Sequence, residues 1–222
     1  MKPTTHLLNT IVIVLLANCA TSQAASWLDD TYVHGDLGPA FTQDTTFHER
    51  GLNFNGPFVK SGQATFDTEI RGDLSFGYNI TKAWAVELEG GVIWAPNEPT
   101  DNEFYQIPVT LNVLYQMPLN KSCNLYFGAG AGGVVNILQF REFNQGYHIP
   151  PLLSDTSLAF GYQAQAGIKY AVSRRIDIGL GYKFLGVDGD SWNFGGPTPG
   201  IHQLKFDSLY THTVLLSFNL KF

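Results

Sequence analysis

Hydrophobic and polar residues alternate along most of this chain. In residues 207–222 one set of alternate positions ends in Val214, Leu216, Phe218, Leu220 and Phe222. In residues 65–80 the even positions are largely apolar, whereas the odd positions carry most of the charge. A period of two is that of a β-strand with one apolar face. The pattern therefore predicts a chain built from strands.

Eight segments alternate in this way, and the connections between them differ in length. The segments cover residues 32–41, 65–80, 83–95, 104–117, 124–138, 157–172, 176–187 and 207–222. The connections 79–83, 118–123 and 173–175 are short, whereas 42–64, 96–103, 139–156 and 188–206 are long. Short turns at one end and long loops at the other are typical of bacterial outer-membrane barrels. We therefore predict an all-β fold, an eight-stranded antiparallel up-and-down transmembrane β-barrel.

Aromatic residues gather at both ends of the apolar strand faces. At the short-turn end these are Tyr78, Trp84, Tyr115, Phe127, Tyr170 and Phe222. At the long-loop end they are Phe41, Phe66, Trp94, Tyr105, Phe160, Phe184 and Tyr210. Two aromatic rings around an aliphatic band match the two interfaces of a bilayer. A lipocalin-like soluble barrel would instead turn its apolar residues inward.

The opposite strand faces carry charges that must line the barrel interior. They are Asp67, Glu69, Arg71, Asp73, Glu87, Glu89, Lys169, Asp177 and Lys183. An unpaired buried charge is costly. We therefore predict that Arg71, Lys169 and Lys183 contact Glu69, Glu87, Glu89 or Asp177. Gly128, Gly130 and Gly132 share the inward face and should make room for bulkier neighbours. Pro39 removes a ladder donor, so the first strand should end or bulge there.

The N-terminus has the form of a secretory signal peptide. Lys2 and His6 precede the largely apolar residues 7–16, and small residues follow to Ala25. We predict a signal peptide over residues 1–24 and a barrel domain over 25–222. An anchor helix and a lipoprotein with lipidated Cys19 are the alternatives. If Cys19 is removed, Cys123 has no disulfide partner, and we expect it to be a tolerated surface thiol.

Charge and motifs exclude several function classes. The chain has 13 Lys and Arg against 19 Asp and Glu, a net charge of −6, so it offers no basic face for nucleic acid. Residues 128–133 match GxGxxG but lie within a strand with no helix after it, which argues against nucleotide binding. No Cys/His cluster has zinc spacing. We predict no catalytic, cofactor-binding or metal-ligating residues. His212 should lie at the membrane interface, and Glu87 and Glu89 should form structural pairs rather than do acid–base work.

The long loops combine acidic and apolar residues. The acidic ones are Asp44, Glu49, Glu98, Asp101, Glu103, Glu142, Asp155, Asp188 and Asp190. They predict a solvated acidic surface, with divalent cations near lipopolysaccharide as the alternative. The apolar ones include Phe47, Leu52, Phe54, Phe58, Trp192, Phe194 and Ile201. These residues either contact a surface ligand or fold back over the barrel mouth.

Several strand motifs resemble those of a known group. They are YVHGDLG at 32–38, PVTLNVLY at 108–115, YFGAG at 126–130, FGYQAQAG at 160–167, GYKF at 181–184 and the terminal Phe222. The chain resembles the small eight-stranded outer-membrane barrels of the opacity-protein and OmpA-like superfamily. The resemblance implies a Gram-negative outer membrane, with its lipid and lipopolysaccharide as partners. It also implies that the assembly machinery reads the strand that ends in Phe222.

For function we expect a non-enzymatic structural or surface-interaction scaffold that displays four extracellular loops. A lipid A-modifying enzyme is one alternative. Its deacylase type uses a His-x-Ser pair, and none of the six histidines has Ser two positions on. A small passive pore is the other alternative. The inward charges Arg71, Lys183, Glu87 and Glu89 favour a plugged lumen over this pore.

Overall fold

The computed structural model describes residues 30–53, 55–97, 102–141, 152–194 and 200–222. The predicted signal peptide and Cys19 lie outside these residues. Among the described residues, no helix is long and apolar enough to cross a membrane.

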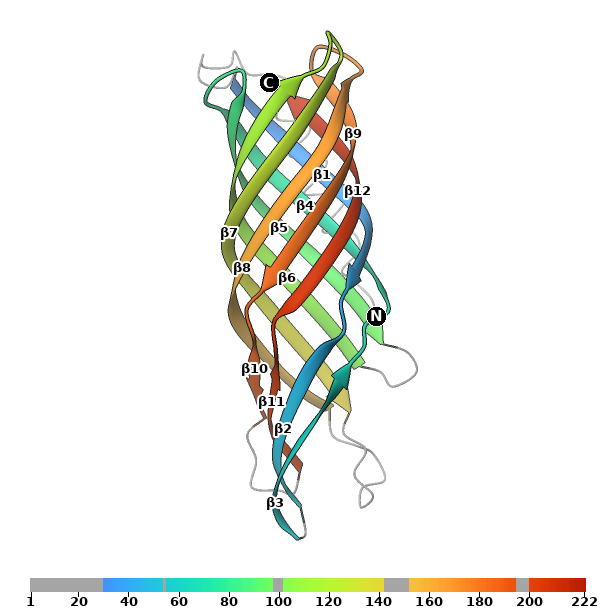
Figure 1. Cartoon of the computed structure of the whole chain (residues 1–222), viewed down its shortest axis with the longest axis vertical. Helices are drawn as coiled ribbons and strands as arrows, with labels where there is room; N and C mark the ends of the chain where they lie inside the picture. Colours follow the sequence, from blue (N-terminus) through green and yellow to red (C-terminus); the bar gives the residue numbers. More distant parts are fainter. Residues whose placement is uncertain (1–29, 54, 98–101, 142–151, 195–199) are drawn as a thin grey trace, which may run out of the picture.

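Eight strands close into a single antiparallel barrel, in the order β1-β12-β9-β8-β7-β6-β5-β4 (Figure 1). Their bounds are β1 Thr31–Thr42, β4 Thr68–Asn79, β5 Trp84–Asn97, β6 Asn102–Pro118, β7 Cys123–Arg141, β8 Leu152–Ala171, β9 Ile176–Val187 and β12 Leu209–Lys221. β1 closes the barrel by pairing with both β4 and β12. The predicted fold class is confirmed, and closure gives every barrel strand a hydrogen-bonded neighbour on both sides, as a lipid environment requires.

The apolar strand faces point outward, as the alternation predicts. Leu37, Leu74 and Leu216 are each at least 60% exposed, whereas polar and charged residues fill the interior. Aromatic neighbours pair across strands at both ends. The rings of Trp84 and Tyr115 lie 5.0 Å apart near the short turns, and those of Trp94 and Tyr105 stack 6.5 Å apart near the long loops.

Two prolines interrupt the ladders without ending their strands. β1 runs through Pro39 to Thr42, but its ladder with β12 pairs Leu37 with Leu216 and next Ala40 with Thr213. The β5–β6 ladder skips the positions around Pro108 in the same way. Proline has no N–H, so the carbonyl opposite receives no ladder donor. The register of β1 with β12 is the same on both sides of the gap, so the prediction that the first strand ends or bulges at Pro39 is wrong.

Gly128 and Gly130 of β7 make room for bulky neighbours, as predicted, whereas a side chain on Gly132 would meet the backbone of Val109 and Thr110. A side chain on Gly128 would collide with Leu114, and one on Gly130 would collide with Asn112. The β6–β7 register brings these residues together, since it pairs Leu114 with Gly128 and Asn112 with Gly130.

Two of the predicted long loops are largely strands. Residues 42–64 contain β2 (Thr45–Asn53) and β3 (Gly56–Ala64), and residues 188–206 contain β10 (Ser191–Asn193) and β11 (Gly200–Phe206). β2 pairs with β11, so the two hairpins form one four-stranded sheet in the order β10-β11-β2-β3. In Figure 1 this sheet extends from the barrel at the end opposite the C-terminus. It is built from two of the long connections, which are predicted to face the outside of the cell, so we call it the extracellular sheet.

The second predicted segment begins too early. β4 starts at Thr68, not at residue 65, and Asp67 is exposed rather than inside the lumen. Phe66 does not join the belt of outward-facing aromatic residues at the long-loop end, where it was predicted to lie. Its ring lies 5.8 Å from that of Phe104 and 6.3 Å from that of Phe206, both of which are buried. Burial of this ring against the extracellular sheet replaces contact with lipid.

Candidate functional site: a filled lumen below an extracellular sheet

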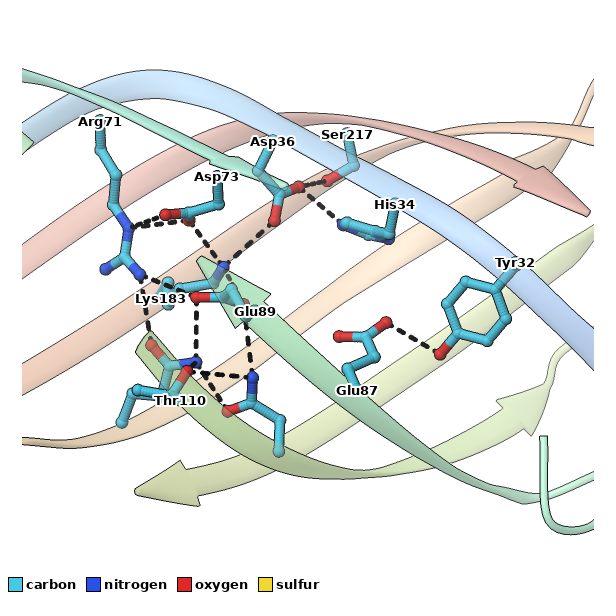
Figure 2. A network of polar contacts seen from close by, with 12 residues as sticks. Tyr32, His34, Asp36, Arg71, Asp73, Glu87, Glu89, Thr110, Lys183 and Ser217 are labelled. Atoms are coloured by element: carbon cyan, nitrogen blue, oxygen red, sulfur yellow. Dashed lines mark hydrogen bonds and ion pairs between the residues drawn. The ribbon is translucent and has the colours of Figure 1, made fainter. Parts of the chain in front are cut away.

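A buried ion cluster lies in the lumen, as Figure 2 shows. Lys183 on β9 places its Nζ 2.8 Å from Asp73, 2.9 Å from Glu89 and 3.2 Å from Asp36. Arg71 on β4 contacts Asp73 at 2.8 Å and Glu89 at 3.1 Å. All five side chains are at most 1% exposed, so water does not reach them from either mouth. We call these five residues the ion cluster.

The contacts of Arg71 and Lys183 with Glu89 are confirmed predictions. Asp36 was not identified from the sequence, although His34 and Ser217 also hold it. His34 Nε2 lies 2.8 Å from Asp36 Oδ1, and the Ser217 hydroxyl donates to the same oxygen at 2.6 Å. The alternation of β1 could have placed His34 and Asp36 on the inward face.

Amides extend the ion cluster across the barrel. Gln163 Nε2 donates to Glu89 at 3.1 Å, to Asn112 at 2.7 Å and to Thr110 at 3.0 Å. Arg71 donates in turn to Gln163 Oε1 at 3.2 Å. These residues come from β4, β5, β6 and β8, so polar side chains connect strands on different sides of the lumen (Figure 2).

The prediction for Lys169 is wrong. Its Nζ lies 4.7 Å from the ring centre of Tyr126 and 5.5 Å from that of Tyr32, rather than against a carboxylate. Aromatic faces attract a cation through their quadrupole. Glu87 instead accepts a hydrogen bond of 2.8 Å from the Tyr32 hydroxyl. Asp177 pairs with Lys221 at 2.7 Å, nearer the short turns.

A second polar chain crosses the lumen between the ion cluster and the sheet. The Thr42 hydroxyl donates to Glu69 at 2.7 Å and lies 2.7 Å from the Thr211 hydroxyl. Gln106 donates to Asn136 at 3.1 Å, and Asn136 donates to Asp190 at 2.6 Å. Asp190 is 5% exposed, so it belongs to the barrel interior and not to the predicted solvated loop surface.

An apolar cluster closes the mouth below the extracellular sheet. Trp192 is 0% exposed, its ring lies 5.0 Å from that of Phe206, and its Nε1 donates to the Asn136 carbonyl at 3.3 Å. The cluster joins barrel residues to sheet residues: Ala40, Ile93, Phe104, Val134, Leu138, Leu185, Val187, Trp192, Phe194, Leu204, Phe206 and Leu209. Phe47 and Ile201 pack against it. Phe47, Trp192, Phe194 and Ile201 therefore fold over the mouth, the second of the two predicted outcomes, whereas Leu52 and Phe58 are not part of this cluster. Phe54 lies outside the described residues.

The extracellular sheet has one covered edge and one open edge. β10 contacts β8, and the Asn193 N–H donates to Asp155 at 2.8 Å. At the other end, β3 pairs with β2, and no described strand lies on its far side. Val59 on this edge is 72% exposed.

One polar triplet lies on the outer face of this sheet. Ser61 Oγ is 2.8 Å from His48 Nδ1, and His48 Nε2 is 3.6 Å from Asp207 Oδ1. A hydrolase triad contains the same three residue types, but there the histidine Nε2 faces the serine and Nδ1 faces the aspartate, the reverse of the contacts of His48. The side chains of His48 and Asp207 are 41% and 56% exposed, so this triplet lies in solvent.

His212 and Cys123 are the two remaining residues whose positions were predicted from the sequence. His212 lies at the outer surface near the long loops, with Nδ1 2.6 Å from the Tyr182 hydroxyl and Nε2 2.8 Å from Gln43 Nε2. Cys123 is a half-buried free thiol at the start of β7. Within the described ranges, no group of three or more His, Cys, Asp or Glu residues could hold a metal ion.

The family model of the outer membrane protein beta-barrel domain matches residues 10–222. The chain belongs to this family. The protein is therefore an outer-membrane β-barrel of the bacterial outer membrane, and the predicted resemblance and location are confirmed.

Solved outer-membrane barrels have the same fold. OprG from Pseudomonas aeruginosa matches with a TM-score of 0.55 and 16% identity, covering 86% of this chain and 96% of that one. Neisserial surface protein A matches with a TM-score of 0.52 and 15% identity, covering 87% of this chain and 97% of that one. The outer membrane protease OmpT from Escherichia coli matches with a TM-score of 0.51 and 9% identity, covering 91% of this chain and 100% of that one. No curated protein matches the chain significantly. Since a protease shares the fold, the fold alone does not decide between scaffold and enzyme.

Proposed function

We propose that this outer-membrane barrel is a non-conducting, non-enzymatic scaffold whose extracellular sheet is its interaction surface. The single observation that carries the proposal is the combination of a filled lumen with a folded sheet above it. The ion cluster and the apolar cluster occupy the interior, and the most buried groups are at most 1% exposed. A passive pore would need a continuous wet path past these groups.

The open edge of β3 is the part of the sheet best suited to a partner. Asn53 pairs with Gly56, and the next residue, Pro57, has no N–H to give to Leu52. The Asn53–Gly56 pair is therefore a hydrogen-bonded pair, and hydrogen-bonded pairs alternate with the other kind along the β2–β3 ladder. Val59 and Ser61 then direct their N–H and C=O groups to the open edge. An exposed strand edge can accept an extended peptide as a further strand. The partner class is therefore an extended polypeptide segment.

Selection of peptides on the folded protein tests this proposal. The full barrel in lipid nanodiscs is used to select binders from displayed random peptides. Val59→Pro removes an edge N–H and no β2 ladder bond, so it should abolish binding while the barrel stays folded. Val59→Ala removes the side chain and should keep binding. Binders that tolerate Val59→Pro, or a selection that yields none, would reject the edge as the interface.

A surface hydrolase is a second candidate, favoured only by the contacts of Ser61, His48 and Asp207. A serine activated by histidine reacts with fluorophosphonate probes. The wild type should label and Ser61→Ala should not, if this candidate is correct. The scaffold proposal expects no labelling of either protein.

The terminal strand supports a proposal about assembly. β12 presents alternating outward residues up to Phe218, and the Phe222 N–H donates to the Thr31 carbonyl at 3.2 Å. We propose that the assembly machinery recognises this strand with Phe222. Deletion of Phe222 should lower the amount of folded barrel in cells. Refolding of the purified variant into detergent should remain unchanged, which separates recognition from stability.

A further inference from the structure

A shallow, wide-open hollow of about 530 Å³ lies on the outside of the barrel wall, over parts of β1, β4, β5 and β6. Its lining residues are Asp36, Gly72, Asp73, Leu74, Gly90, Gly91, Val92 and Ile107. The side chains of Asp36 and Asp73 are 1% and 0% exposed within the lumen, so these residues give only main chain to the floor. A Cβ on Gly90 would meet nothing within 4 Å. The hollow therefore has aliphatic walls and a floor of bare backbone.

The floor contains a carbonyl without a ladder donor. The β5–β6 ladder pairs Gly90 with Val109 and Ile93 with Gln106, and it skips the two positions between. In this register Gly91 lies opposite Pro108, which has no N–H to give. The Gly91 carbonyl consequently loses its bond from β6. An unsatisfied backbone group at membrane depth costs several kcal/mol, because hydrocarbon offers no hydrogen bond.

The gap at Pro39 in the β1–β12 ladder differs from the gap at Pro108 in the β5–β6 ladder. There the carbonyl without a donor belongs to Val214, opposite Pro39, and it lies against the backbone of Gly38. A side chain on Gly38 would collide with that oxygen. Neighbouring main chain thus covers the Val214 carbonyl, whereas the Gly91 position borders an open hollow.

The hollow lies at the depth of the outer leaflet. Val92 and Ile107 are each two residues from the stacked pair Trp94 and Tyr105, which marks the interface on the long-loop side. Lipopolysaccharide forms this leaflet in Gram-negative bacteria, and its acyl chains include 3-hydroxyacyl chains. Such a chain combines hydrocarbon for the walls with a hydroxyl donor for the floor. A simple acyl chain lacks the donor.

We propose that this hollow binds a 3-hydroxyacyl chain of an outer-leaflet lipopolysaccharide. The hydroxyl donates to the Gly91 carbonyl, and the hydrocarbon packs against Leu74, Val92 and Ile107. This site lies on the outside of the barrel wall, so it is independent of the extracellular sheet and of the proposed partner.

Two matched probes test the proposal. They are 2,3-diacylglucosamine 1-phosphate with 3-hydroxytetradecanoyl chains and the same molecule with tetradecanoyl chains. Binding of each to the full barrel in detergent is measured by native mass spectrometry. The hydroxylated probe should bind roughly 2- to 10-fold more tightly, the worth of one net hydrogen bond. Equal binding of the two probes would overturn the proposal.

Three variants locate the site. Gly90→Leu fills the hollow without a collision, so it should remove the preference for the hydroxylated probe. Pro108→Val returns an N–H to the ladder and should also remove the preference. Ala164→Leu places the same side chain at an exposed outward position of β8 and should leave the preference intact. A preference that survives both Gly90→Leu and Pro108→Val would place the binding elsewhere and refute this site.

Discussion

Removal of the lysine at the centre of the ion cluster should destabilise the barrel strongly. Lys183 Nζ lies within 3.2 Å of three carboxylates, and its side chain is 1% exposed. In Lys183→Met, Arg71 is the only cation left in the ion cluster, and it contacts Asp73 and Glu89 but not Asp36. Loss of one partner from a buried ion pair costs about 3–5 kcal/mol, because the remaining charge is left uncompensated. We expect the free energy of unfolding to fall by that amount.

Reversible urea unfolding in lipid vesicles, followed by tryptophan fluorescence, measures this change. Lys60→Met is the matched control, since Lys60 is 67% exposed and lies 3.9 Å from Glu49. Such a solvent-exposed pair contributes at most about 1 kcal/mol. A double-mutant cycle with Glu89→Gln should also give a coupling energy of about 0.5–3 kcal/mol.

The reasoning fails if Lys183→Met and Lys60→Met unfold alike. Equal stabilities would mean that water already solvates the ion cluster. The lumen would then be wet at its most charged level, and the scaffold proposal would lose its main support.

Three further predictions concern packing and orientation. Trp192→Ala should lower the free energy of unfolding by about 3–5 kcal/mol and expose the extracellular sheet to trypsin, because it empties the apolar cluster. Gly130→Val should abolish the folded band on unboiled gels through collision with Asn112, whereas Ala129→Val on the lipid side should keep it. On intact cells, an impermeant maleimide should label Ser61→Cys, while Cys123 should label only after permeabilisation; labelling of Cys123 on intact cells would reverse the assigned orientation.

The alternation predicts the barrel well because each strand separates lipid from lumen. A strand such as β4 cannot shift by one residue without placing Arg71 or Asp73 in hydrocarbon, so the sequence fixes its register. The inward charges and the contacts of Lys183 and Arg71 with Glu89 follow from the same constraint. Lys169 escaped prediction because two tyrosine rings, rather than a carboxylate, surround its ammonium group.

The alternation of residues within each segment could not predict the extracellular sheet. β2 and β11 pair although they lie more than 140 residues apart in the sequence, and each hairpin alone resembles a polar loop. The same long-range packing draws Phe66 against Phe104 and Phe206, so β4 begins at Thr68 and not at residue 65. Asp190 was assigned to solvent for this reason, although Asn136 on a distant strand binds it inside the barrel.

Single-channel recording of the refolded barrel in a planar bilayer tests the filled lumen most directly. The folded band on an unboiled gel verifies the sample first. The ion cluster and the apolar cluster predict no steady conductance at any salt concentration. A steady, ohmic conductance from the verified barrel would contradict the filled lumen and return the passive pore as the function of the protein.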